Sequence, residues 1–319
     1  MNDFLRIPLG QWVEDGIDFF IETFGFVFDF IKLVISSVAD GMNFVFTSPP
    51  FWVMLIIFAV LAFVARGWLF SLGTTLGFLL ILSLDQWDNA MDTLALVLVA
   101  AVIAVAISVP LGILAAKYRS VSTVVKPVLD FLQTMPAFVY LIPALILFRI
   151  GDVPGIVATV LFALAPGVRL TELGIRGVDK EVVEAGQAFG SSPSRILRQI
   201  QLPLAMPSIM AGINQVIMLS LSMVVIASMV GAGGLGKPVI QSLSRADVAL
   251  GFEAGLSVVI LAIFLDRLTA SFGSGRGYFR FILDSFSVRG RKTEVLESEP
   301  AVDTAAASSE PAEHTPPVR

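Results

Sequence analysis

The sequence has no cysteine and a single histidine, His314, which lies in a polar stretch near the C-terminus. Without cysteine there is neither a disulfide framework nor a thiolate metal site, and nothing surrounds the lone histidine from which a catalytic or metal centre could be built. Charged residues are also scarce, at 15% against about 25% in a soluble domain. With 56% hydrophobic residues and a mean hydropathy of +0.85, the composition favours an integral membrane protein.

Long apolar stretches support this class. Crossing about 30 Å of hydrocarbon takes roughly 20 apolar residues in a helix. Seven stretches qualify or come close: 51–65, 67–84, 93–116, 131–148, one from near Pro154 past Arg169, one inside the uncharged window 199–236, and 250–270. We therefore predict an all-α fold, a polytopic membrane helical bundle.

The composition divides the chain into four regions. Residues 1–48 hold seven acidic and two basic residues, and an irregular mixture of Phe, Ile and charges over 19–35 predicts an amphipathic helix at the membrane surface. Residues 49–86 hold two accessory spans, and residues 87–275 hold the five-helix core. Residues 276–319 end in a stretch rich in Glu, Ala, Ser and Pro, for which we expect a mostly disordered tail.

Basic residues in the short loops give the expected orientation, because Lys and Arg concentrate on the cytoplasmic side. They lie between the third and fourth spans, between the fifth and sixth, and after the seventh: Lys117, Arg119, Lys126; Arg176, Lys180, Arg195, Arg198; Arg276, Arg280, Arg289, Arg291, Lys292. This arrangement predicts an external N-terminus and a cytoplasmic C-terminus.

The stretch GAGGLGKP, residues 231–238, has the glycine and lysine spacing of a phosphate-binding loop. Such a loop needs a strand before it and a Ser or Thr after the lysine, and Pro238 occupies that position here. The stretch also follows an apolar helix and is expected outside the cell. We therefore predict an external, close-packed turn formed by its glycines: Gly231, Gly233, Gly234, Gly236.

The stretch between the fifth and sixth spans, VDKEVVEAGQAFGSSPSRILRQIQLPLAMPS, contains two amphipathic pieces that meet at Gly190. Ser191 or Ser192 is expected to cap the second piece, with Pro193 at its first position. Two prolines, Pro203 and Pro207, are expected to interrupt the chain before the sixth span. From the pattern alone, an ordinary amphipathic loop resting on the membrane surface explains this stretch equally well.

The spacing E-A-x4-G-x9-I-x-L-P within it resembles the coupling motif in the membrane subunits of bacterial ABC importers. It is formed by Glu184, Ala185, Gly190, Ile200, Leu202 and Pro203. The third motif position, commonly alanine, is Gly186. Over residues 90–270, stretches such as DFLQTMPAFVYLIPALILF and LSMVVIASMVGAGGLG are similar to the permease subunit of glycine betaine/proline betaine importers.

The resemblance implies a type I ABC permease core with two extra N-terminal spans, in a bacterial inner membrane. It further implies a homodimer of this chain, two ATP-binding subunits that bind the ATP and magnesium, and a separate external substrate-binding protein. The chain itself would hold no cofactor or metal, catalyse no reaction and bind no nucleic acid. The coupling segment, residues 179–204, would transmit ATPase closure to the spans. Arg195 and Arg198 would pair with ATPase carboxylates or form a solvated face.

Polar residues inside the spans have two interpretations each. Asn214 and Gln215 either line the translocation path or hold helices together, and packing is favoured. Arg169, Glu172 and Arg176 are spaced for a local ion-pair ladder along one helix, since charges within a membrane are costly unless paired.

Other functions remain open at this point. An importer for another small solute, such as methionine or choline, would share the coupling motif. A proton-driven secondary transporter would need an intramembrane carboxylate and usually an inverted repeat. A structural membrane protein would leave the coupling motif unexplained.

Overall fold

A computed structural model describes residues 8–273, and every regular element in that range is a helix. The predicted tail 276–319 and the first seven residues of the predicted acidic segment lie outside the described residues. The elements are α1 (Leu9–Thr47), α2 (Phe51–Arg66), α3 (Trp68–Ser83), α4 (Trp87–Lys117), α5 (Arg119–Thr134), α6 (Ala137–Phe148), α7 (Asp152–Arg176), α8 (Lys180–Ala188), α9 (Pro193–Ile196), a π-helix (Leu197–Gln201), α10 (Leu202–Ser222), α11 (Val224–Ser228), α12 (Gly236–Arg245) and α13 (Val248–Gly273).

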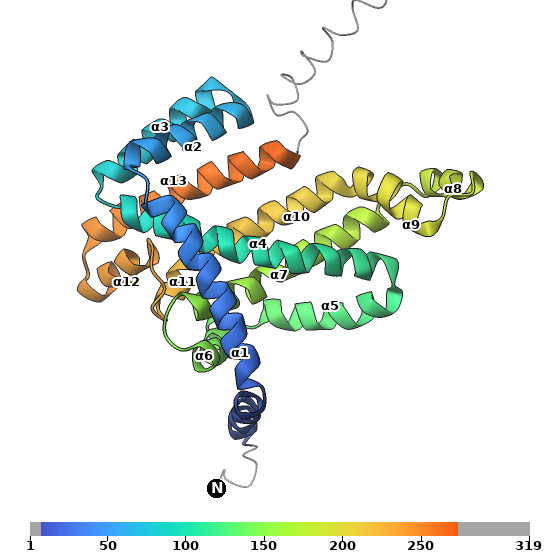
Figure 1. The fold of residues 1–319 in the computed structure, drawn as a ribbon, viewed down its shortest axis with the longest axis horizontal. Coiled ribbons are helices and arrows are strands. Elements are labelled where there is room, and N and C mark those ends of the chain that lie inside the picture. The colour runs from blue at the N-terminus through green and yellow to red at the C-terminus, as the bar shows by residue number, and fades with distance from the viewer. Residues whose placement is uncertain (1–7, 274–319) are drawn as a thin grey trace, which may run out of the picture. The chain divides into compact units, whose positions relative to one another are not determined.

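Three long helices, α4, α7 and α10, form the centre of the bundle (Figure 1). Helices α8 and α9 lie at one end of these helices, and α11 and α12 lie at the other. Small residues let the central helices approach closely: a Cβ added at Gly112 of α4 would lie 2.6 Å from Thr171 Cβ of α7. Gly167 of α7 likewise leaves no room for a side chain beside Ser108.

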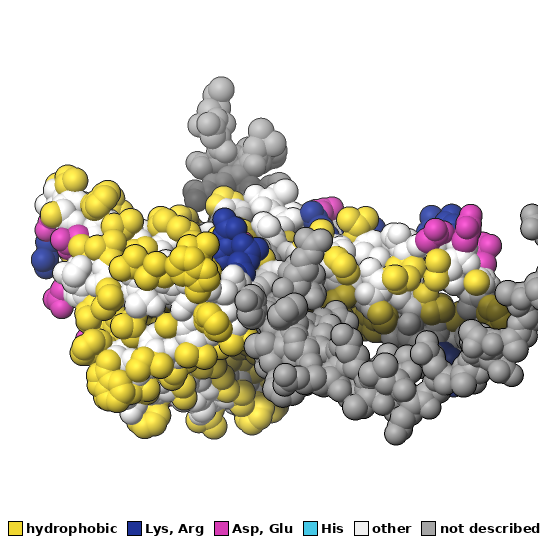
Figure 2. Space-filling model, turned by 90° about the horizontal axis from the view of Figure 1, so that it is seen from above, with side chains coloured by type: hydrophobic (Ala, Val, Ile, Leu, Met, Phe, Trp, Pro, Cys, Tyr) yellow, Lys and Arg dark blue, Asp and Glu magenta, His cyan; other side chains and the backbone are white. Residues whose placement is uncertain are grey.

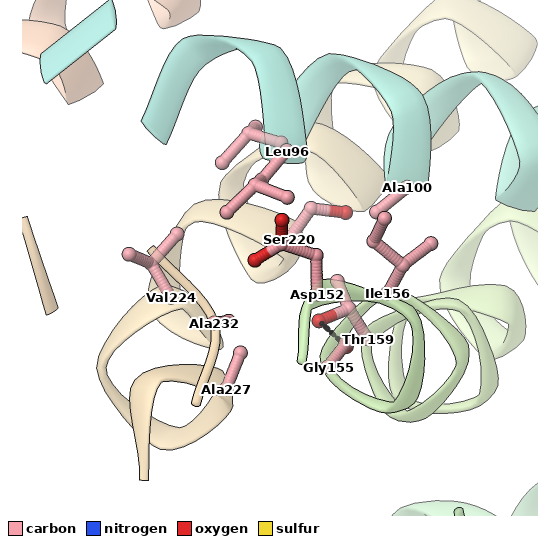
Figure 3. A pocket seen from close by; sticks show the side chains of 11 residues that line it. Leu96, Ala100, Asp152, Gly155, Ile156, Thr159, Ser220, Val224, Ala227 and Ala232 are labelled. Atoms are coloured by element: carbon pink, nitrogen blue, oxygen red, sulfur yellow. Dashed lines mark hydrogen bonds between the residues drawn. The ribbon is translucent and has the colours of Figure 1, made fainter. Parts of the chain in front are cut away.

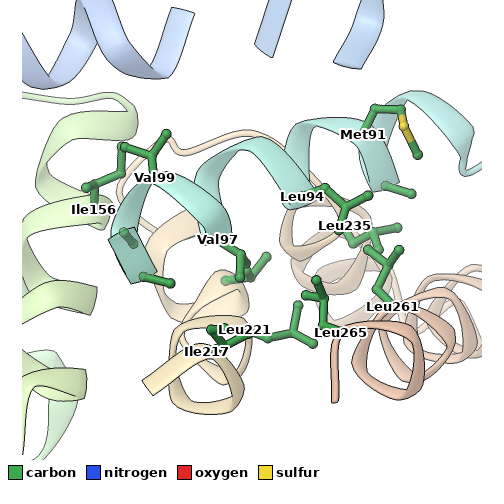
Figure 4. Close-up of a cluster of buried hydrophobic side chains, with 14 of the residues drawn as sticks. Met91, Leu94, Val97, Val99, Ile156, Ile217, Leu221, Leu235, Leu261 and Leu265 are labelled. Atoms are coloured by element: carbon green, nitrogen blue, oxygen red, sulfur yellow. The ribbon is translucent and has the colours of Figure 1, made fainter. Parts of the chain in front are cut away.

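The hydrophobic core fills the space between α4 and its neighbours (Figure 4). Met91, Leu94 and Val97 of α4 pack there against side chains from α7, α10 and α13: Ile156, Ile217, Leu221, Leu261, Leu265. Outside this core, many large apolar side chains are exposed on the described surface, and hydrophobic atoms dominate the face seen in Figure 2. An exposed apolar surface of this extent suits a hydrocarbon environment.

The described residues contain four helical stretches that are long and apolar enough to cross a membrane: Trp87–Lys117, Asp152–Arg176, Pro193–Ser228 and Val248–Ser271. Two bent helix pairs raise the number to six if each pair counts as one span. The expectation of seven spans is not met, because α3 has only 16 residues. At 1.5 Å per residue it is about 24 Å long, short of the hydrocarbon thickness.

The expected span over residues 131–148 is not one continuous helix, because the chain bends by 98° between α5 and α6. The break occurs at Met135, which has the extended conformation that a following proline favours, and Pro136 has no N–H to continue the helix. Tyr140 compensates for part of the lost bonding. Its hydroxyl oxygen lies 2.6 Å from the carbonyl of Leu132 and 2.8 Å from that of Met135.

The N-terminal region contains a longer helix than the sequence suggested. Helix α1 has 39 residues with a kink at Phe24, and it packs against α4, α6 and α7. In Figure 1 it crosses α4, and Asn43 of α1 donates a hydrogen bond of 2.7 Å to Asp92 of α4. The two accessory helices, α2 and α3, pack against each other and against α13.

Candidate functional site

The first piece of the coupling segment is α8, whose two ends are closed by local hydrogen bonds. At its start the Asp179 carboxylate accepts a bond from the backbone N–H of Glu181 at 2.9 Å. At its end Gly190 has a φ of +75°, and the N–H groups of Gly190 and Ser191 donate to the carbonyls of Gln187 and Gly186. This is a Schellman motif, and its left-handed residue is usually glycine.

The second piece begins at Pro193 and continues without interruption into α10. The predicted hydroxyl cap is absent, because the side chain of Ser192 makes no capping bond and only its carbonyl accepts bonds from the helix. The expectation that Pro203 and Pro207 interrupt the chain was also wrong. A π-helical turn, closed by a bond from Leu202 N–H to Leu197 C=O, directly precedes Pro203, and the chain stays helical across both prolines.

The two pieces touch where Gly186 of α8 meets Ile200. A Cβ at position 186 would lie 2.7 Å from Ile200 Cδ1, so glycine brings α8 closer than the alanine common at this motif position would. Gly186 and Ile196 are buried, while Ile200 and Leu202 are half-buried. The structure therefore brings Gly186, Ile196 and Ile200 into one small interface.

The remaining residues of the segment face outward. Glu184, Ala185, Arg195, Arg198 and Pro203 are exposed, and among the described residues neither arginine forms an ion pair. Phe189 was missed by the sequence analysis, and it is 89% exposed at the end of α8. Its signal in the sequence was an aromatic residue directly before the glycine that ends the helix. Within residues 8–273 no other part of the chain covers this surface.

The base of the segment is anchored in the bundle. Ile175 of α7 and Ala205 and Ile209 of α10 form a buried cluster, against which Leu197 and Leu202 pack. A cavity of about 220 Å³ lies beside this cluster, lined by Ala116, Lys117, Ile175, Arg176, Pro193, Leu197 and Gln201. Movement of the segment would therefore act on α10 directly and on α7 through this cluster.

The loop that follows α11 at the opposite end is held by α4 and α7. Leu235 N–H donates to the Thr93 hydroxyl at 2.8 Å, and Gly233 N–H donates to the Asp152 carboxylate at 3.0 Å. Gly231 and Gly234 have φ values of +97° and +82°. No strand precedes the loop within the described residues, and Lys237 lies exposed in α12, so the geometry is that of a packed turn.

The space beneath this loop is nearly filled (Figure 3). Ala232 of the loop and Ala227 of α11 lie near Gly155 of α7 around a cavity of about 10 Å³. A cavity of that size is at the lower limit for one water molecule. Glycine and alanine at these positions therefore serve close packing.

Asn214 and Gln215, which are adjacent in α10, have different surroundings. Asn214 donates a hydrogen bond of 2.9 Å to the Asp266 carboxylate of α13 and accepts one from the Thr269 hydroxyl. Gln215 is exposed. The sequence analysis missed Asp266 as the partner, because the two residues are 52 positions apart and only the fold brings them together.

Comparison with known proteins shows to which family this helical bundle belongs. The family described as "Binding-protein-dependent transport system inner membrane component" matches residues 108–275, just over half of the chain and the whole candidate coupling segment. The chain belongs to this family. It is a permease, and its helical bundle with several apolar helices is that of a multi-pass inner-membrane protein.

Individual relatives are also named as transport permeases. The permease is 49% identical over 276 residues to the glycine betaine/carnitine transport permease protein GbuB of Listeria monocytogenes, covering 85% of this chain and 98% of that one. It is 45% identical over 267 residues to the glycine betaine/proline betaine transport system permease protein ProW of Escherichia coli, covering 84% of this chain and 75% of ProW.

A solved structure of the MetNI methionine ABC transporter, in inward-facing conformations, resembles this permease with a TM-score of 0.54. The match has 22% identity and covers 60% of this chain and 95% of that chain. At this identity the likeness concerns the fold, and it confirms the predicted type I ABC permease core.

Proposed function

We propose that this permease is the transmembrane subunit of an ATP-driven importer for a small osmoprotectant with a quaternary ammonium group, such as glycine betaine or proline betaine. The observation that carries the proposal is the set of relatives 45–49% identical over more than four fifths of the chain, all named for glycine betaine. More distant relatives are named for choline and trimethylamine N-oxide, which also carry a fully methylated nitrogen.

The coupling segment, residues 179–204, is proposed to dock on an ATP-binding subunit. Its outward surface offers one large aromatic side chain, Phe189, beside charged groups of both signs. An aromatic anchor with a polar surround is the usual composition of a protein interface. Two copies of this chain would form the pore, with two ATP-binding subunits beneath it and an external substrate-binding protein above it.

Transport would follow from two packed states with different affinities for ATP and solute. ATP binding closes the ATPases and moves the coupling segments, and the unbroken helix from Pro193 to Ser222 carries that movement into the bundle. The permease catalyses no covalent step, and its partner subunits bind the ATP and magnesium.

The proposed orientation has the coupling segment and the C-terminus in the cytoplasm and the GAGGLGKP loop outside; the expected external N-terminus further requires that α2 and α3 cross the membrane as two short spans. Two observations support it. The segment and the loop lie at opposite ends of the central helices. The basic ends of α4 and α7 lie together at the coupling end, where Arg176 donates a bond of 2.8 Å to the carbonyl of Ala115.

The decisive experiment reconstitutes the permease with its ATPase and binding protein in liposomes and measures uptake of labelled glycine betaine. We expect uptake that requires ATP and is competed by choline or carnitine only where the binding protein accepts them. Uptake driven by a proton gradient without ATP would instead identify a secondary transporter. ATP-driven uptake of methionine but not of betaine would overturn the proposed substrate.

A further inference from the structure

Helix α5 is attached to the bundle by few apolar contacts. Of its 16 residues only Ser122 and Leu129 are buried, whereas the neighbouring α7 buries fifteen of 25. Leu129 packs with Ala165 and Val168 in a small cluster of its own. Because few apolar contacts within the chain hold this helix, its polar contacts contribute strongly to its position.

Those polar contacts converge on Glu172, a carboxylate of α7 that is only 4% exposed. It accepts a hydrogen bond from the Ser122 hydroxyl at 2.8 Å and lies 3.2 Å from Lys126 Nζ, both on α5. Arg176 Nε lies 3.0 Å away, one turn further along α7. We call Glu172, Ser122, Lys126 and Arg176 the Glu172 junction.

The junction confirms the Glu172–Arg176 pair of the ion-pair ladder expected along α7 and corrects the other pair. Arg169 does not pair with Glu172 but with Asp130 of α5, and both side chains of that pair are exposed. Two ion pairs therefore connect α5 to α7, one between a buried carboxylate and an exposed lysine and one exposed on both sides. Only the buried carboxylate is shielded from water and salt, so it holds its partners at a defined place.

The junction also adjoins the base of the coupling segment. Besides contacting Glu172, Arg176 donates to the carbonyl of Ala115 on α4 and lines the 220 Å³ cavity with Pro193 and Leu197. One residue before it, Ile175 belongs to the buried cluster on which Leu197 and Leu202 pack. The last turn of α7 thus touches α4, α5 and the coupling segment.

We propose that Glu172 is a positioning residue for transport, which fixes α5 to α7 so that movement of the coupling segment reaches the bent α5–α6 pair. The 98° bend makes this consequential, because a small rotation of α5 displaces α6 sideways. The proposal rests on the proposed coupling role of residues 179–204.

The first test compares solute imported per ATP hydrolysed in the assembled transporter. In Glu172→Ala and in Lys126→Met we expect this ratio to fall at least tenfold while ATP hydrolysis continues. Lys126 is 53% exposed, so its variant keeps the test valid if Glu172→Ala does not assemble. The matched control is Asp130→Asn, which breaks only the exposed pair and should keep the ratio within twofold. Uptake and hydrolysis that fall in parallel, or an unchanged ratio, would overturn the proposal.

The second test measures the distance between α5 and α7 in the absence of nucleotide. Because the chain has no cysteine, spin labels can be placed at Val124→Cys on α5 and Leu173→Cys on α7, which are 67% and 64% exposed. With Glu172 present we expect one narrow distance distribution, and with Glu172→Ala or Lys126→Met a broadened or shifted one. An unchanged distribution overturns the proposal. Failure of the coupling role would appear elsewhere, as normal uptake in Gly190→Leu, and would leave these distances as they are.

Discussion

At Gly190 and at Gly234 the backbone is left-handed, with φ of +75° and +82°, but the two glycines have different surroundings. Nothing lies within 4 Å of a Cβ added at Gly190, whereas one added at Gly234 would lie 2.5 Å from the Thr93 hydroxyl. Gly190 at the coupling end is needed for backbone conformation alone, whereas Gly234 at the loop end is needed also for space. One end is open for a partner, and the other is closed by its own chain.

The largest effect on transport is expected when Gly190 is replaced. Replacing it with leucine forces a side chain into the left-handed region, at about 1–2 kcal/mol, and tilts α8 against α9. We expect uptake to fall at least tenfold while ATP hydrolysis persists, measured in liposomes. Gly190→Ala should do nearly as much harm, because conformation and not room is limiting, and Gly190→Asn should do less. The control is Gly255→Ala in α13, where open space surrounds the added methyl.

At Gly234 the prediction concerns stability. Gly234→Ala should lower the free energy of unfolding by about 1–3 kcal/mol, because its methyl collides with Thr93 and its φ is strained. Thermal unfolding of the purified permease in detergent measures this. Thr93→Ser keeps the acceptor for Leu235 N–H and should be nearly neutral. If Gly234→Ala proved as stable as the wild type, the loop end would not be closed in the manner described.

Phe189 tests whether the coupling end is open for a partner. Phe189→Ala should leave stability within about 0.5 kcal/mol, since the side chain touches little of its own chain. Binding of the ATP-binding subunit should nevertheless weaken by about 1–2 kcal/mol, as for a typical aromatic anchor. A binding assay on the detergent-solubilised permease provides the measurement. Equal affinity for both forms would move the docking surface away from α8.

The smallest effect, on the free energy of unfolding, is expected at Asn214 of α10, between the coupling end and the loop end. Asn214→Ala removes the contact with Asp266 and should cost about 0.6 kcal/mol, the average for a polar contact between membrane helices. Thermal unfolding beside Gln215→Ala, an exposed neighbour, isolates that contact. A loss of transport without a loss of stability would instead place Asn214 on the translocation path.

Hydropathy was sufficient to predict the membrane class, because stretches such as Trp87–Lys117 are apolar along their whole length. It failed at Pro136, since averaging over a window hides a single residue that cannot donate a backbone bond. The reverse error occurred at Pro203 and Pro207. Both were expected to break the chain, but the chain stays helical across them, and no composition rule reports the wider hydrogen-bonded turn directly before Pro203.

The candidate site was predictable where its residues are close in sequence. The fixed motif spacing singled out Gly186, Gly190 and Ile200, and the structure places these residues where the two pieces meet. Contacts between distant residues were not predictable from one sequence. Glu172 meets Ser122 fifty positions away, and spacing along α7 suggested Arg169 as its partner instead.

The π-turn at Leu197–Gln201 contains one residue more than an α-helical path would need. Since each α-helical residue advances about 100° around the axis, that surplus residue sets the azimuth at which α9 leaves α10. Deleting a single residue there would turn Arg195 and everything before it to another side of the bundle. The direction in which the coupling segment leaves the bundle thus depends on the length of this five-residue turn.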